Sequence, residues 1–233
     1  MNDYVMQLVP VRTQTKIKQV LNVFETGSIN GDYANVTVYH DGKNNTRQIT
    51  YGKTQTTEQG NLRTLIASYI DHHGFYADSF RPYLPKIGVT PLGDNNAFIN
   101  LLRRAGNDPV MQHTEDSFFD NLYYFPACGF FSANRFSFPL SLLVIYDSYI
   151  QSGGILSFLR NKFATRTPAY MGDEKTWIQN YVITRHQWLL CGAEGTRPLL
   201  AKTCYRTACL LDQVRQGNWQ LEEKIRTQGV MIG

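Results

Sequence analysis

The stretch ETGSINGDYANVTVYHDGKNNTRQITYG, residues 25–52, carries an acid, two alternating segments and a hydroxyl within a short span. Residues 35–40 alternate β-branched side chains with other residues, and residues 47–51 have strand-type composition, so the two segments are typical of paired strands. Asp41 and Gly42 lie between them and begin a run of strong turn formers. The stretch therefore predicts a β-hairpin.

A helix is predicted directly before this hairpin. Apolar residues between positions 17 and 24 are spaced to share one helix face, and Gly27 favours an end to that helix. Glu25 would then lie in the last turn. A carboxylate there meets the negative end of the helix dipole, which favours its protonated form. This position suits a general acid.

Glu25 and Asp41 form a pair of acids with different surroundings. Glycoside hydrolysis uses such a pair, one acid to protonate the leaving oxygen and one base to activate water. Asp41 could also be only a turn former, because Asp-Gly is a common turn sequence. Asp32, next to Gly31 and Tyr33, is the alternative candidate for the base.

The order of Glu25, Asp41 and the motif Ile-Thr-Tyr-Gly at 49–52 resembles the lysozyme superfamily, whose phage-type members share the order Glu, Asp, Thr. The rest of the chain resembles the glycoside hydrolase family 46 chitosanases. The similar segments are 139–154, with Ile-Tyr-Asp in an apolar helix, 173–185, which ends in an arginine, and the C-terminal segment 206–218.

This resemblance implies an α+β, mainly α-helical, lysozyme-like fold with two lobes. A small β-lobe would cover about residues 25–60, and a larger helical lobe would cover about 61–233 together with the N-terminal helix. With 42% hydrophobic and 13% aromatic content, the 233 residues can bury a large core. Since no linker-like segment divides the chain, we expect a single catalytic domain over residues 1–233.

The resemblance also implies the catalytic roles. Glu25 would protonate the glycosidic oxygen, Asp41 would activate water, and the Thr50 hydroxyl would hold that water. A base on a hairpin leaves room for water, and a carboxyl separation of roughly 6.5–9.5 Å would give inversion.

A buried charge at Asp147 would be costly unless it were paired. Arg185 and Arg206 resemble the residues that support the acid in the chitosanases, with Arg197 and Arg215 as alternatives to Arg206. The residues expected to bind substrate are Tyr33, Tyr51, Gln55 and Asn61.

The charge of the chain bears on the substrate. A formal net charge of +4 favours an anionic partner. Asn61 also stands where the chitosanases carry an acid that would hold an ammonium group. We therefore expect the polysaccharide substrate to be peptidoglycan, with chitosan as the alternative. A non-catalytic cell-wall-binding or structural module is a second alternative.

Other classes of function find less support. The cysteines and histidines lack metal-ligand spacing, so we expect no metal and no organic cofactor. The basic residues are too scattered to predict nucleic-acid binding. The longest apolar stretch, 138–146, is too short to span a membrane. We expect a monomer, and the sequence identifies no immunity or delivery protein.

The first residues lack the basic and apolar regions of a signal peptide. We therefore expect synthesis in the cytoplasm, followed by release or export to the cell wall, the periplasm or the exterior. A phage endolysin or an antibacterial effector would fit that route.

Further helices are expected at 198–215 and 219–226, with Asp94 as the cap of another. The aromatic-rich stretch 118–138 is expected to be core or a platform for sugars.

Overall fold

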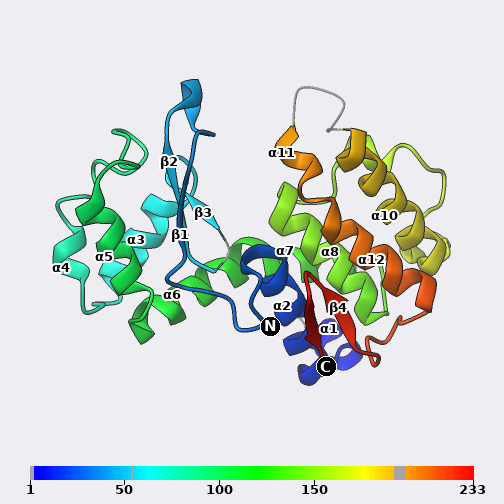
Figure 1. Cartoon of the computed structure of the whole chain (residues 1–233). Helices are drawn as coiled ribbons and strands as arrows, with labels where there is room; N and C mark the ends of the chain where they lie inside the picture. The colour runs from blue at the N-terminus through cyan, green and yellow to red at the C-terminus, as the bar shows by residue number, and fades with distance from the viewer. Residues whose placement is uncertain (1–2, 54, 192–197) are drawn as a thin grey trace. The chain divides into compact units, whose positions relative to one another are not determined.

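A computed structural model describes residues 3–53, 55–191 and 198–233 (Figure 1). The expected α+β class, mainly helical with a small antiparallel sheet, is confirmed. The chain forms two compact units, one made of Met1–Phe24 with Asn121–Gly233 and the other of Glu25–Asp120. They are called the helical unit and the sheet unit below.

The sheet unit contains the predicted hairpin and one further strand. Strands β1 (Val36–Tyr39), β2 (Gln48–Tyr51) and β3 (Thr56–Thr57) form an antiparallel sheet in the order β1-β2-β3. In the turn between β1 and β2, Asn44 and Asn45 take left-handed backbone angles, which asparagine tolerates better than most residues. Strand β3 was not predicted because two residues are too few to show an alternating pattern.

Four helices complete the sheet unit: α3 (Leu62–Asp71), α4 (Ala77–Phe80), α5 (Asn96–Ala105) and α6 (Pro109–Phe119). Their apolar faces share one core with β2, so the unit reaches residue 120 rather than ending near residue 60 as expected. The cap of α5 is Asn95, whose side chain accepts the Phe98 N–H at 3.0 Å. The expected cap, Asp94, lies one residue too early and instead pairs with Arg47 at 2.8 Å.

The helical unit is built around α8 (Pro139–Ser152), in which residues 139–148 are all buried. A helix that is apolar on every side belongs in a core. The other helices of this unit are α1 (Asp3–Leu8), α2 (Val11–Thr26), α7 (Phe125–Ala133), α9 (Ser157–Arg160), α10 (Glu174–Cys191), α11 (Pro198–Ala201) and α12 (Cys204–Gln216).

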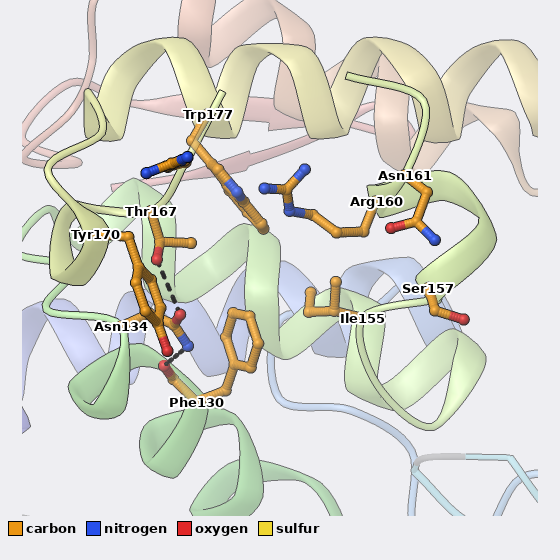
Figure 2. Close-up of a pocket in the computed structure, with 10 residues that line it drawn as sticks. Phe130, Asn134, Ile155, Ser157, Arg160, Asn161, Thr167, Tyr170 and Trp177 are labelled. Carbon is orange, nitrogen blue, oxygen red and sulfur yellow. Dashed lines mark hydrogen bonds between the residues drawn. The ribbon is translucent and has the colours of Figure 1, made fainter. Parts of the chain in front are cut away.

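The aromatic-rich stretch 118–138 is partly core, because four of its nine aromatic side chains are buried. Phe131 and Phe136 are fully buried, and Phe136 packs against Trp177 of α10 with ring centroids 5.1 Å apart. Trp177 and Phe130 also border a surface pocket (Figure 2). Phe131 and Phe136 therefore stabilise the helical unit, while Phe130 and Trp177 can meet a ligand in the pocket.

Two helix predictions near the C-terminus were wrong. Residues 219–226 do not form a helix; β4 (Ile225–Thr227) and β5 (Val230–Ile232) form a hairpin instead. The burial of β4 alternates with every second residue, which is the pattern of a strand. The helix expected over 198–215 is divided into α11 and α12, and Thr203 donates a side-chain hydrogen bond to the Leu200 carbonyl at 2.6 Å at the break.

Glu115 of α6 is a fully buried acid next to the end of β2. Its Oε2 accepts the Lys53 N–H at 3.0 Å, and a Cβ on Gly52 would lie only 2.3 Å from the same oxygen. Gly52 is therefore required both by this close approach and by its φ of +81°. Burial, opposed by the Lys53 hydrogen bond, raises the pKa of Glu115 to about 8.

This raised pKa predicts a pH-dependent stability. The folded chain holds a proton on Glu115 that the unfolded chain releases above its ordinary pKa of 4.5, so the stabilisation is full below pH 4.5 and is lost as pH rises through about 8. Glu115→Gln keeps the neutral form at every pH. We expect this variant to exceed the wild type in unfolding free energy by on the order of 4 kcal/mol at pH 9 and to match it near pH 4.5.

Urea unfolding at both pH values measures this difference. Glu222→Gln, at an exposed acid, is the matched control and should show no such change. A constant difference between Glu115→Gln and wild type at the two pH values would contradict the prediction.

Candidate active site

Glu25 lies in the last turn of α2, as predicted, and Gly27 follows the helix with a left-handed φ of +73°. The Phe24 carbonyl accepts a hydrogen bond from the Tyr205 hydroxyl at 2.5 Å. The Val23 carbonyl accepts one from the Gln228 side chain at 3.2 Å. These contacts satisfy carbonyls that a helix end leaves without intrahelical partners, and they fix the turn that carries Glu25.

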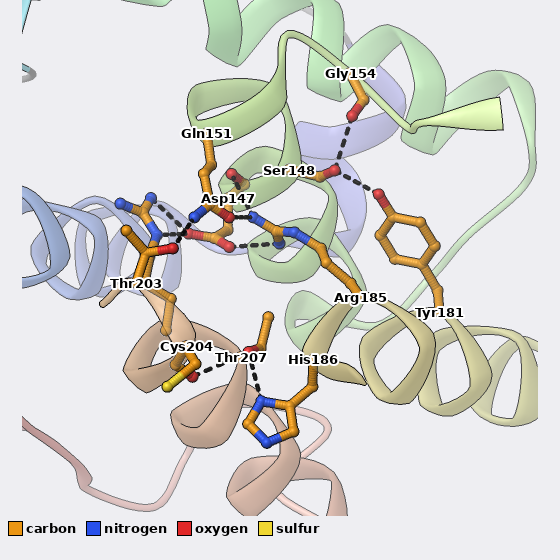
Figure 3. Close-up of polar contacts among 11 residues, drawn as sticks. Asp147, Ser148, Gln151, Gly154, Tyr181, Arg185, His186, Thr203, Cys204 and Thr207 are labelled. Carbon is orange, nitrogen blue, oxygen red and sulfur yellow. Dashed lines mark hydrogen bonds and ion pairs between the residues drawn. The ribbon is translucent and has the colours of Figure 1, made fainter. Parts of the chain in front are cut away.

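Asp147 forms a buried ion triad with Arg185 and Arg206. Figure 3 shows its contact with Arg185. Its Oδ2 accepts from Arg185 Nη1 at 2.6 Å, and its Oδ1 accepts from Arg206 Nε at 2.8 Å. Burial alone would raise the pKa of Asp147, but the two guanidinium groups outweigh it and hold that pKa below its usual range. Arg185 also donates to the Gln151 side chain.

The structure thus brings together the three residues expected in the supporting network. Of the alternatives to Arg206, Arg215 pairs with the exposed Asp212 at 3.3 Å, and Arg197 lies outside the described residues. The Arg206 guanidinium also lies over the Phe24 ring, 5.2 Å from its centroid. The triad therefore supports the residue immediately before Glu25.

Asp41 is exposed on the turn after β1, in the sheet unit. Its Oδ1 accepts a hydrogen bond from the Gln48 side chain at 3.0 Å. The adjacent Gly42 N–H donates to the Thr46 carbonyl at 3.0 Å, and a Cβ on Gly42 would lie 2.6 Å from the Thr46 hydroxyl. The carboxylate therefore lies on a tightly closed turn that is accessible to water.

Asp32, the alternative base, is also exposed. Its Oδ1 accepts the Ala34 N–H at 2.9 Å, which is the local bond of a turn-forming aspartate. This local contact explains Asp32 as a structural, turn-forming residue. The hydrogen bond to Asp41, in contrast, comes from Gln48 on the neighbouring strand β2.

Thr46 lies on the same turn as Asp41, whereas the expected Thr50 lies in β2. Thr50 is 5% exposed and lies opposite Thr37 within the sheet, away from the turn. Thr46 closes the turn, where its Oγ1 donates to the Lys43 carbonyl at 2.8 Å. The position of Thr46 at the end of the turn that begins at Asp41 is a signal that the sequence contains.

The residues expected to bind substrate have different environments. Tyr51 is fully buried in the core, so the prediction that it binds substrate was wrong. All four residues of β2 are buried, because strands flank β2 and helices pack against it. Burial also raises the pKa of Tyr51 well above its ordinary value. The Tyr33 hydroxyl donates to Asp116 at 3.0 Å and accepts from Lys53. Gln55 is half-buried with a left-handed φ of 59°.

Asn61 is exposed at the start of α3 and makes no side-chain capping bond there. Of the expected substrate contacts, it has the most accessible polar group.

Within the described ranges, no cluster of three or more histidine, cysteine, aspartate or glutamate side chains could hold a metal ion. The same part of the chain contains no helix that is both long and apolar enough to cross a membrane.

The model of glycosyl hydrolase family 46 matches residues 19–225, a range that includes Glu25, Asp41 and the whole triad. The chain belongs to this family. As a family 46 member it is a glycoside hydrolase of the lysozyme-like superfamily, as the resemblance implied. No curated protein sequence matches the chain significantly.

Solved structures agree with this family assignment. A chitosanase from Bacillus subtilis MY002 superposes with a TM-score of 0.82 at 21% identity, over 97% of this chain and 100% of the other. A family 46 chitosanase from Gynuella sunshinyii, in complex with chitotetraose, gives a TM-score of 0.79 at 22% identity over 96% and 97%. A mutant of the Bacillus subtilis enzyme with six glucosamine units gives 0.78 at 21% over 97% and 100%. Family 46 members of this kind share the fold of the chain.

Proposed function

We propose that this family 46 hydrolase cleaves the β-1,4 linkages of chitosan. The observation that carries the proposal is the family match, which spans both candidate catalytic acids and the buried triad. Chitosanases with the same fold, two of them in complex with chitotetraose or six glucosamine units, support this substrate class. Peptidoglycan, expected from the net charge, has no corresponding support among these structures. A net charge sums over the whole surface and does not report the charge at a binding site.

The proposed reaction is a single displacement with inversion. Glu25 donates a proton to the glycosidic oxygen as the bond from that oxygen to the anomeric carbon breaks. Asp41 takes a proton from a water molecule, whose oxygen bonds to the opposite face of the same carbon. We assign the orientation of that water to the hydroxyl of Thr46, because Thr46 lies on the same turn as Asp41 whereas Thr50 is buried in the sheet. This chemistry requires no metal or organic cofactor.

Inversion requires room for the water molecule between acid and base, a separation of roughly 6.5–9.5 Å between the two carboxyl groups when substrate is bound. Contacts at or beside each acid support the proposal. The Phe24 backbone next to Glu25 is held by Tyr205, and Asp41 is held by Gln48. Side chains held in place by neighbouring contacts lose less entropy when the reaction geometry is reached.

Digestion of purified chitosan and purified peptidoglycan in parallel tests the proposal. We expect glucosamine oligomers from chitosan by mass spectrometry and no muropeptides from peptidoglycan. Proton NMR of the first products should show the α-anomer, because inversion of a β-linkage produces it. Muropeptides alone would restore the peptidoglycan prediction, and no product from either polymer would favour a binding module.

A further inference from the structure

The helical unit contains a pocket of about 300 Å³ whose lining residues include neither Glu25 nor any member of the triad (Figure 2). It lies among α7, α9, α10 and the short helix η3 (Pro168–Tyr170). Phe130, Tyr170 and Trp177 contribute aromatic rings to its lining. A volume of this size is at the lower end for small-molecule sites and suits a ligand of one sugar ring.

Two arginines give the pocket its charge. Arg160 and Arg166 both line it, and no acidic side chain is among the described residues of the lining. In the described part of the chain, neither guanidinium forms an ion pair with a carboxylate. Arg160 donates to the Phe163 and Thr165 carbonyls, both at 2.8 Å, and its guanidinium lies over the Phe163 and Trp177 rings, 4.7 and 5.8 Å from their centroids; these contacts orient the group without supplying a carboxylate. A pocket of this kind attracts an anionic group.

The wall that carries Arg166 is held firmly in place. The Ala169 N–H donates to the Asn134 carbonyl at 3.0 Å. The Thr167 hydroxyl donates to the Asn134 side chain at 3.0 Å, as Figure 2 shows. Gly172 packs so closely that a Cβ there would lie 1.7 Å from the Arg166 carbonyl oxygen. A loop fixed by such contacts is already organised, which lowers the entropic cost of binding.

The remaining polar groups suit a ligand rich in hydroxyls. Ser157, Asn161 and Tyr170 line the pocket, and their side chains make no hydrogen bond within the described ranges. Tyr170 is 66% exposed, so its ring face and its hydroxyl are both available. An aromatic face beside free hydroxyl and amide groups can hold the apolar face and the rim of a sugar ring at once.

We propose that this pocket binds an acidic monosaccharide of the uronic-acid class, with its carboxylate on Arg166 and its ring against Tyr170. Glucosamine would be rejected, because its ammonium group meets two guanidinium charges and no acid. The pocket is therefore not an additional subsite for chitosan. The proposal does not depend on the proposed catalytic activity.

Isothermal titration of the intact chain with sodium D-glucuronate tests the proposal. We expect saturable binding of glucuronate and much weaker binding of D-glucose, D-glucosamine and sulfate, each of which lacks either the anion or the sugar. Arg166→Gln should weaken glucuronate binding about tenfold or more, since it removes a charge-assisted hydrogen bond. Lys162→Gln is the matched control, because it removes one exposed charge from the same segment without altering the pocket lining.

Absence of saturable glucuronate binding, or equal binding by wild type and Arg166→Gln, would overturn the proposal. If glucose binds as tightly as glucuronate, the pocket does not recognise the anion. If sulfate binds as tightly as glucuronate, the pocket does not recognise the sugar ring. Chitosan cleavage by Arg166→Gln, measured alongside, should equal that of the wild type. Failure of the pocket proposal would therefore be distinguishable from failure of the proposed hydrolase activity.

Discussion

Glu25→Gln is expected to lower kcat/KM on chitosan by about 10³-fold, because the amide cannot donate the proton that the leaving oxygen requires. The substitution keeps the size of the side chain at the end of α2. Reducing-end release from chitosan measures the rate, and circular dichroism checks that the variant is folded. A variant that retains wild-type activity would remove Glu25 from the mechanism.

The base can be identified with a matched pair of variants. Asp41→Asn should lower kcat/KM by about 10²-fold or more, since it removes the group that takes a proton from water. Asp32→Asn makes the same chemical change at another exposed turn of the sheet unit and should leave the rate unchanged. The reverse result would transfer the role of base to Asp32.

Asp147→Asn is expected to cost about 3–5 kcal/mol of unfolding free energy. The substitution preserves volume but leaves the Arg185 and Arg206 guanidiniums buried without a counter-charge. Activity should also fall, because Arg206 lies against Phe24, next to the catalytic acid. Urea unfolding at neutral pH measures the stability change.

Asp212→Asn provides the control for this prediction. It breaks an ion pair with Arg215 whose side chains are 73% and 58% exposed, and such pairs contribute about 0–1 kcal/mol. Similar losses of unfolding free energy in the two variants would mean that burial does not make the triad more important for stability than an exposed ion pair. A small loss for Asp147→Asn alone would show that water reaches the two arginines.

The positions of the two catalytic candidates followed from local patterns. The helical spacing before Gly27 placed Glu25 in a last turn, and strand alternation on both sides of Asp41 placed that residue on a hairpin. The helix expected within the apolar segment 139–154 is likewise present, as the buried helix α8. Each pattern depends on neighbours within a few residues of one another, so the chain alone contains the information.

Sequence by itself determined that Asp147, set in an apolar helix, needed a cationic partner, because an unpaired buried charge is too costly to keep. Only the tertiary structure decided that Arg185 and Arg206 meet it while Arg215 pairs at the surface. It also buried Tyr51 and placed Thr46 on the turn of Asp41. These outcomes depend on packing and hydrogen bonds between separate elements, which local periodicity does not encode.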